Sequence, residues 1–444
     1  MNYSGIHTYN SSSLFEVVDL KSCNNSFTRL FYRVKKLLGK GQGQIEMIHG
    51  FYFRFYNKFH NDLICCILSK IAYFLYCCLY LIKKARRSKK SVNMTYKEAK
   101  DNINAIYPRP KSNPICENQP INKDVDLSVI IPVYNHKDII EDNINFILNQ
   151  KTDYNYEVIL IDDGSTDGVT EIIKQYESNP KVKLIYQENG GIGSARNTGI
   201  NNAIGKYIMF IDCDDVVHND IVENLMSSAY ENNYDMVMAA HNLVKETDGK
   251  VVDIIPNVYS QHNLLNFKNN DKIMNLAGLP WCKVYKRELW NNVRFFPGYW
   301  YEDTVILPLI FTQVKKYKYI TNIEYEYKWF ESNFSHTQNG NVVNKKMIER
   351  YWLYIEIIEQ YEKMNLPIDD KFYTLLLRHM SQYYYPTIKN MDEKTIDSMF
   401  VLARELCEKY KPNHKVKLPY MLRQVEKAFD NNDIELWKLA SCYQ

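Results

Sequence analysis

The chain has 444 residues and, with 55 lysines and arginines against 52 aspartates and glutamates, a formal net charge of +3. It is too long for one ordinary domain, so two or three domains are expected. The near balance of charge provides no overall basic field, and we therefore expect no nucleic acid partner. The ten cysteines show no C-x-x-C spacing, which indicates a reducing compartment rather than a disulfide framework.

The first 95 residues contain one long apolar segment, Leu63–Ile82, in which Lys70 is the only charge, and the basic block 83–90 follows it directly. About twenty such residues can just cross a bilayer with the basic block on the cytoplasmic side, but a charge in mid-membrane opposes a span. Three alternatives stay open: a span, a helix lying on an anionic lipid surface, and a helix buried against the rest of the protein. We favour the first two, in which the N-terminal segment 1–95 is membrane-associated and the region that follows it is cytoplasmic.

The sequence pattern changes at residue 124. Residues 96–123 contain several prolines and no long periodic pattern, which predicts a linker. Between 124 and 340, short apolar runs alternate with helical patterns such as the one over Ile140–Leu148. This alternation predicts an α/β domain with a doubly wound, mostly parallel sheet.

Polar clusters follow the apolar runs where strands are expected to end. These clusters are Tyr134-Asn135, Asp162-Asp163 and Asp212-Cys213-Asp214-Asp215. The carboxyl ends of parallel strands meet at one edge of a sheet, where ligands bind in such folds. Because side chains alternate along an extended chain, Asp212 and Asp214 point the same way and form an oxygen-only site. Such a site suits Mg²⁺ or Mn²⁺ shared with phosphate oxygens; a solvated acidic turn is the alternative for this segment alone.

A glycine-rich segment lies between the second and third clusters. Gly190, Gly191 and Gly193 allow the backbone to approach a ligand closely. A dinucleotide-binding fingerprint would need Gly or Ala where Arg196 stands, so that reading is excluded. An arginine at the start of a short helix favours an anion, and a surface pair of Arg196 with an aspartate is the alternative.

Two later segments carry further candidates. One contains Trp281-Cys282-Lys283, and in the other Glu302-Asp303 leads into a helical run over 305–314. Carboxylates in a first helical turn commonly serve only as partners of the helix dipole, so position alone does not decide their role. From residue 341 the pattern is helical. We expect a C-terminal helical accessory domain over 341–444 that binds a substrate, contacts the membrane or forms a homo-oligomer.

The chain resembles a family 2 inverting glycosyltransferase of the GT-A fold, of the kind that builds bacterial cell-surface polysaccharides. The resemblance covers residues 124–340 and rests on V-I-I-P-V-Y-N, V-I-L-I-D-D-G-S-T-D, N-G-G-I-G-S-A-R-N-T-G, D-C-D-D and E-D, which occur in the family's order. It implies a transferase that uses a nucleotide-sugar, expected to be a UDP-sugar, with Mn²⁺ or Mg²⁺. The acceptor it implies is a hydroxyl group on a glycan or on a lipid-linked or polymer precursor.

The resemblance also implies roles for individual residues. Asp303 corresponds to the catalytic base, with Glu302 as its neighbour, and Asp214 to the metal ligand. Asp212 corresponds to a ribose contact and a second metal candidate, and His336 to a metal or phosphate contact in a loop that closes over the diphosphate. The remaining residues assigned to the nucleotide-sugar are Pro132, Tyr134, Asn135, Asp163, Asn189, Gly190, Arg196, Lys283 (phosphate) and Trp281 (sugar stacking, with core packing as the alternative).

Two other functions are considered. A non-catalytic scaffold subunit of a glycan-synthesis complex could have lost either Asp214 or Asp303, and both are present. A nucleotidyltransferase also pairs carboxylates with a metal, but it usually shows a basic, glycine-rich signature near the start of the domain, and none occurs here. The glycosyltransferase is therefore the leading hypothesis.

Overall fold

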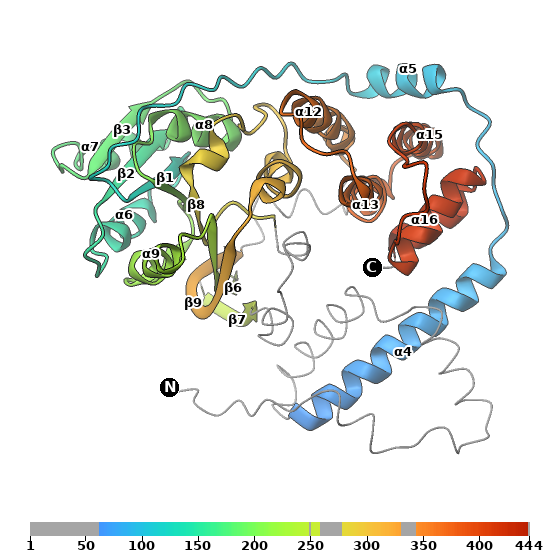
Figure 1. The fold of residues 1–444 in the computed structure, drawn as a ribbon, viewed down its shortest axis with the longest axis horizontal. Coiled ribbons are helices and arrows are strands. Elements are labelled where there is room, and N and C mark those ends of the chain that lie inside the picture. Colours follow the sequence, from blue (N-terminus) through green and yellow to red (C-terminus); the bar gives the residue numbers. More distant parts are fainter. Residues whose placement is uncertain (1–61, 248–249, 258–277, 330–342, 443–444) are drawn as a thin grey trace. The chain divides into compact units, whose positions relative to one another are not determined.

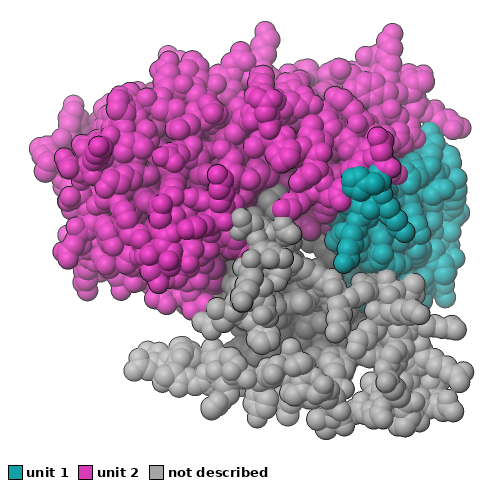
Figure 2. All heavy atoms as spheres, in the orientation of Figure 1, with its two compact units in different colours: residues 1–92, 414–444 teal, residues 93–413 magenta. Residues whose placement is uncertain are grey.

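The computed structural model describes residues 62–247, 250–257, 278–329 and 343–442. The chain forms two compact units, residues 93–413 and residues 1–92 with 414–444 (Figure 2). Each unit is described by itself below. The boundaries expected from the sequence, at residues 95, 123 and 340, stay a prediction.

Residues 93–413 are built on a nine-stranded sheet in the order β3-β2-β1-β4-β8-β6-β9-β5, with β7 paired to β6 (Figure 1). Its first half is parallel, as expected from the alternation of strands and helices. In register, Leu127 of β1 lies between Tyr156 of β2 and Tyr207 of β4. The parallel strands are β1 (Leu127–Val133), β2 (Tyr156–Asp162), β3 (Val182–Tyr186) and β4 (Tyr207–Phe210).

The second half of the sheet is mixed, so the expectation of a mostly parallel sheet is wrong there. β4 and β6 are antiparallel to β8, β5 is antiparallel to β9, and only the β6–β9 pair is parallel. Parallel neighbours need a long crossover connection, which is usually an α-helix, and no α-helix lies between 232 and 348 in the described residues. These strands are β5 (Val216–Val217), β6 (Met236–Thr247), β7 (Lys250–Asn257), β8 (Lys283–Lys286) and β9 (Tyr317–Trp329).

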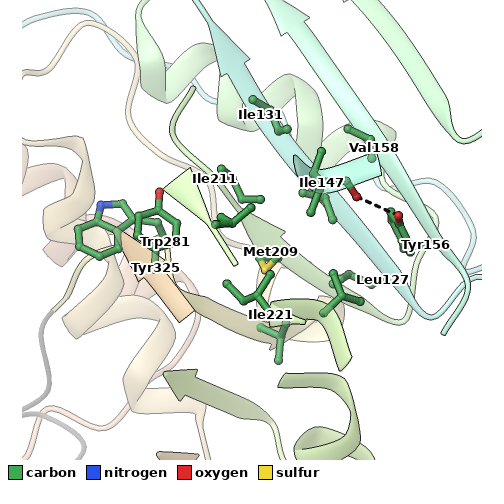
Figure 3. Close-up of a cluster of buried hydrophobic side chains, with 14 of the residues drawn as sticks. Leu127, Ile131, Ile147, Tyr156, Val158, Met209, Ile211, Ile221, Trp281 and Tyr325 are labelled. Atoms are coloured by element: carbon green, nitrogen blue, oxygen red, sulfur yellow. Dashed lines mark hydrogen bonds between the residues drawn. The ribbon is translucent and has the colours of Figure 1, made fainter. Parts of the chain in front are cut away.

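Helices cover both faces of the parallel half, which explains why every residue of β1 is buried. On one face, Ile144 and Ile147 pack with Val129 and Met209 in a continuous apolar core (Figure 3). On the other face, Gly199 lies so close to Ile130 that an added Cβ would clash with it. The helices are α6 (Ile140–Leu148), α7 (Val169–Lys174), α8 (Ile192–Asn202) and α9 (Ile221–Glu231).

The expected linker over 96–123 contains a helix, α5 (Tyr96–Ile106), which the sequence reasoning missed. Thr95 and Glu98 cap its start reciprocally, and Ala99 and Ile103 are buried. The T-x-x-E pattern is the signal that predicts such a helix start. Asn102 donates a 3.3 Å hydrogen bond to Ser398 in the helical region that follows the sheet.

The rest of the residue 93–413 unit is helical. Short 3₁₀ and π segments replace the continuous helix expected over 305–314, and the region after residue 343 is helical as predicted. These elements are η2 (Arg287–Trp290), η3 (Glu302–Val305), η4 (Ile306–Ile310), η5 (Phe311–Gln313), η6 (Lys345–Ile348), α12 (Glu349–Lys363), α13 (Asp370–His379), α14 (Tyr385–Ile388) and α15 (Glu393–Lys409).

The other unit contains α4 (Asp62–Arg86), α16 (Tyr420–Asp430) and α17 (Ile434–Cys442). The apolar segment Leu63–Ile82 thus forms a helix. Arg87 makes a 2.6 Å ion pair with Asp433, and Lys84 Nζ donates to Gln424 over 2.5 Å. No helix in the described part of the chain combines the length and the apolarity that crossing a bilayer requires.

Candidate active site

The loops after β1 and β2 are tied to each other. Asn135 adopts a left-handed conformation with φ of 55° directly after β1. Its Oδ1 accepts a 2.7 Å hydrogen bond from the backbone N–H of Thr166, in the loop after β2. Pro132 is buried within β1, whereas Tyr134 is 47% exposed. Of these three candidates, the ring of Tyr134 is the surface that a base can reach.

Asp163 holds the glycine-rich segment in place. Its carboxylate is 2% exposed and accepts hydrogen bonds from the backbone N–H groups of Gly190 at 2.9 Å and Gly191 at 2.8 Å. Gln187 donates a third bond of 2.7 Å to the same carboxylate. Gly191 has a φ of 81°, a conformation that glycine adopts readily. Asp163 therefore fixes Asn189, Gly190 and the start of α8, and its contact with a base stays a prediction.

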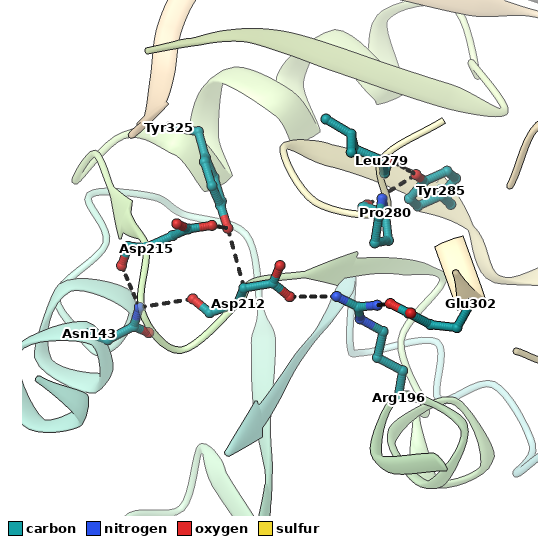
Figure 4. Close-up of polar contacts among 9 residues, drawn as sticks. All are labelled: Asn143, Arg196, Asp212, Asp215, Leu279, Pro280, Tyr285, Glu302 and Tyr325. Atoms are coloured by element: carbon teal, nitrogen blue, oxygen red, sulfur yellow. Dashed lines mark hydrogen bonds and ion pairs between the residues drawn. The ribbon is translucent and has the colours of Figure 1, made fainter. Parts of the chain in front are cut away.

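Arg196 joins the acidic turn after β4 to the Glu302-Asp303 pair (Figure 4). One terminal nitrogen lies 2.6 Å from Asp212 Oδ1, and the other lies 2.8 Å from Glu302 Oε1. The expected alternative, a pair of Arg196 with an aspartate, is therefore present, but the arginine is 2% exposed and the pair is buried rather than at the surface. Burial alone would lower its pKa, but the two carboxylates raise that pKa above its usual range. Residues far apart in sequence thus meet at the sheet edge, as the motifs predicted.

Asp215 is engaged within the protein and is unsuited to bind a ligand. Its carboxylate accepts a 2.6 Å hydrogen bond from the Tyr325 hydroxyl and a 3.0 Å bond from the Lys328 N–H, both on β9. Asn143 on α6 donates a 2.7 Å bond to the Asp215 carbonyl (Figure 4). Burial, with Asp214 close by, raises the pKa of Asp215 well above its usual value. These contacts fix the backbone of the acidic turn.

Asp214 is the free carboxylate of that turn. It has no hydrogen bond or ion pair with another described residue. Burial and the neighbouring Asp212 raise the pKa of Asp214, while His136 and Lys328 lower it. A bound divalent cation would relieve this repulsion, which is the sense in which the turn fits Mg²⁺ or Mn²⁺.

Within the described residues, no group of three His, Cys, Asp or Glu side chains is placed to hold an ion. Asp212 and Asp214 are two carboxylates of the turn that lie close together. Mg²⁺ usually takes one or two carboxylates and completes its shell with water and substrate phosphates. His336, the third expected ligand, lies outside the described residues.

Glu302 and Asp303, in η3, have different surroundings. Burial, together with Asp303, raises the pKa of Glu302 to about 7, although Arg196 opposes the shift. Burial also raises the pKa of Asp303, and Arg350 and Arg196 oppose that shift. Glu302 is paired with Arg196, whereas Asp303 has no ion pair or hydrogen bond with a described residue. Asp303 is therefore the carboxylate free to act on a substrate.

Helix α12 holds the segment that leads into this pair. Glu349 accepts a hydrogen bond from the backbone N–H of Trp300. The guanidinium of Arg350 lies 4.0 Å from the centre of the Tyr301 ring. A second glutamate of α12, Glu356, accepts a 3.2 Å bond from the Tyr299 hydroxyl. Sequence reasoning missed these residues, and the only available signal was the placement of charges beside the apolar face of a predicted helix.

Trp281 and Lys283 lie inside the protein. The indole of Trp281 is 5% exposed and stacks on Tyr325 at 4.8 Å and on Tyr327 at 5.3 Å. The Lys283 ammonium is buried and donates to the carbonyls of Leu279, at 2.8 Å, and Trp281, at 3.2 Å. Burial lowers the pKa of Lys283 to about 8. Both side chains are engaged within the core, which agrees with the packing alternative for Trp281 and disagrees with the expected contacts with sugar and phosphate.

Known proteins share this sequence pattern. A sequence model described as Glycosyl transferase family 2 matches residues 128–291. The Escherichia coli (strain K12) protein named Uncharacterized glycosyltransferase YibD is 31% identical to this chain. The match covers 56% of this chain and 74% of the length of YibD. Glycosyltransferase GlyA of Streptococcus pneumoniae is 31% identical over 46% of this chain, but the match spans only 31% of GlyA. Minor teichoic acid biosynthesis protein GgaB of Bacillus subtilis is 28% identical, over 63% of this chain and 32% of its own.

A solved structure shares the fold. The crystal structure of S. aureus TarS 1–349 in complex with UDP-GlcNAc aligns with a TM-score of 0.52 and 18% sequence identity. The alignment covers 71% of this chain and 90% of that one. At this identity, the likeness concerns the fold alone. The matched family model and the 31% identity to YibD over 74% of its length show that the chain belongs to glycosyl transferase family 2.

Proposed function

We propose that this protein is a metal-dependent inverting glycosyltransferase in cell-surface polysaccharide synthesis. It transfers a sugar from a nucleotide-sugar, expected to be a UDP-sugar, to a hydroxyl group of a glycan or lipid-linked acceptor. The observation that carries the proposal is the Arg196 bridge, which brings the free Asp303 and the acidic turn to one edge of the sheet. The names of two similar proteins support it: TarS was crystallised with UDP-GlcNAc, and GgaB is named for teichoic acid biosynthesis.

The donor would bind along this edge. Tyr134 offers an exposed ring to the base, and Asp163 fixes the glycine segment against which the nucleotide lies. Asp214, with the oxygen of Asp212 that Arg196 leaves free, would hold Mn²⁺ or Mg²⁺. When bound, that ion supplies neutralisation of the charge on the departing nucleotide diphosphate.

The acceptor would be activated by Asp303. Inverting transfer requires one carboxylate to take the proton from the attacking hydroxyl group. Asp303 is free of protein partners, and the positive charges of Arg350 and Arg196 keep its pKa from rising further. Glu302 is neutralised by Arg196 and serves to position its neighbour. The presence of both Asp214 and Asp303 in these settings argues against a scaffold without activity.

The test compares Asp303→Asn, Asp214→Ala and, as a control, Asp138→Asn, which alters an exposed carboxylate. Transfer is measured over a panel of UDP-sugars, and UDP binding is measured calorimetrically with and without Mn²⁺. Asp303→Asn should lower turnover by about 10²-fold or more while retaining UDP binding, and Asp214→Ala should lose the Mn²⁺-dependent part of that binding. Normal transfer by Asp303→Asn would refute the base, and absence of any nucleotide binding in the wild type would refute the function.

A further inference from the structure

Helix α4 has two unlike faces within its unit. One face packs into the protein: Cys77 is 2% exposed and Tyr80 is fully buried, with its ring edge-on to Tyr420 at 6.1 Å. The opposite face is exposed and apolar, because spacings of four, four and three residues align side chains along one side of a helix. This apolar stripe consists of Ile71 (50% exposed), Leu75 (55%), Leu79 (53%) and Ile82 (47%).

Basic residues extend the apolar stripe beyond Ile82. Arg86 stands four residues further on and therefore continues the same side of the helix, and Lys89 follows just past its end. Both are exposed, and neither forms an ion pair with a described residue. Two other basic residues of this block are engaged within the unit, Lys84 with Gln424 and Arg87 with Asp433.

The charge pattern of α4 favours an anionic lipid surface as the partner of the apolar stripe. From residue 63 to residue 90 the sequence contains no aspartate or glutamate, so the exposed charge along this side of the helix is positive only. An apolar stripe that runs into free cations matches the surface of an anionic bilayer, where acyl chains lie beneath phosphate groups. An anionic lipid surface supplies both the apolar layer that accepts the stripe and the negative charge that pairs with Arg86 and Lys89.

We propose that α4 is an interfacial anchor that lies on an anionic membrane. The apolar stripe inserts at the level of the upper acyl chains, and Arg86 and Lys89 contact lipid phosphates. The buried Tyr80 face keeps the helix attached to its own unit, so the helix rests on the bilayer and does not cross it. This inference concerns location and is independent of the proposed chemistry, because vesicle binding requires neither donor nor metal.

The test is co-sedimentation of the full chain with vesicles of phosphatidylcholine alone or mixed with phosphatidylglycerol. The variants are Leu75→Gln/Leu79→Gln, which removes half of the stripe, and Arg86→Gln/Lys89→Gln, which removes the free charges. We expect the wild type to prefer the anionic vesicles, and each double variant to bind them about tenfold more weakly or worse. High salt should weaken binding of the wild type, because it screens exposed charges.

The control is Ile115→Gln/Ile121→Gln, which removes two apolar side chains that are exposed elsewhere, and it should bind like the wild type. Circular dichroism should show all variants folded, because the substituted side chains face outward. Equal binding of wild type and variants, or no preference for anionic vesicles, would overturn the proposal. It would also fall if light scattering showed a dimer that Leu75→Gln/Leu79→Gln dissociates while vesicle binding is unchanged, since a second copy would then cover the stripe.

Discussion

Replacing Arg196 tests whether the bridge between the acidic turn and η3 stabilises the fold. Arg196→Met removes a guanidinium that is 2% exposed and leaves Asp212 and Glu302 facing each other without it. Breaking a buried ion pair by removing one partner costs about 3–5 kcal/mol. The two pairs share one guanidinium, so their losses do not add. Arg196→Lys, which reaches one carboxylate at a time, should lose less.

The loss of stability in Arg196→Met should also depend on pH. Arg196 lowers the pKa of Glu302, which burial has raised to about 7, so removing the arginine lets Glu302 stay protonated to a higher pH. A protonated Glu302 no longer repels Asp212, and the variant recovers stability in acid. The difference between wild type and variant should therefore be smaller near about pH 6 than near about pH 8.

Urea unfolding of the full chain, followed by tryptophan fluorescence at both pH values, measures this loss. The control is Arg109→Met, because Arg109 also binds two glutamates, Glu356 and Glu359, but its side chain is 34% exposed. Solvent screening limits such a pair to about 1 kcal/mol or less. If Arg196→Met costs no more than the control at either pH, the bridge contributes nothing and the reasoning is wrong.

Three further predictions concern single residues. Burial raises the pKa of Glu349 to about 7, so the stability that this residue contributes is complete below about pH 4.5 and is lost as the pH rises through 7. Glu349→Gln should abolish this pH dependence. In urea unfolding at about pH 8, the variant should be more stable than the wild type by on the order of 3 kcal/mol. Tyr299→Phe, which removes one of the three contacts between α12 and the segment before Asp303, should lower turnover about tenfold with UDP affinity unchanged. Tyr361→Phe, which removes another hydrogen-bonded hydroxyl on α12 itself, should leave turnover unchanged. Gly205→Ala should destabilise the sheet by about 1–3 kcal/mol in thermal unfolding, because the new Cβ would lie 2.6 Å from the Ser128 nitrogen; an unchanged melting temperature would contradict that contact.

The parallel half of the sheet could be predicted because its signals are local. The apolar run of β1 and the spacing of Ile140, Ile144 and Ile147 reflect burial on both faces of one sheet, and each is visible within about ten residues. The acidic turn after β4 was identified for the same reason. The bridge from Asp212 to Glu302 through Arg196 was not predicted, because no local pattern places residues that far apart in sequence and the resemblance implied a nucleotide-sugar contact for Arg196.

The rest depended on contacts that the sequence does not display. In the second half of the sheet, the direction of each strand depends on which strands pair. The four residues of β8 do not indicate whether their partners are parallel or antiparallel. Trp281 and Lys283 were assigned to sugar and phosphate from the resemblance. Their neighbours Tyr325 and the Leu279 carbonyl, which contact the two side chains, are known only once the chain is folded. The same holds for Glu349, whose partner is a backbone N–H.

The dependence of Asp215 on β9 has a consequence for how the chain is made. Its carboxylate is satisfied by Tyr325 and Lys328, which follow it by 110 and 113 residues. During synthesis, the strands up to β4 leave the ribosome well before those partners, while a buried carboxylate without them opposes closure of the acidic turn. Contacts of such long sequence separation form late and slowly. A nascent chain that stops short of residue 317 therefore contains all four parallel strands and still lacks the strand whose residues satisfy the buried Asp215.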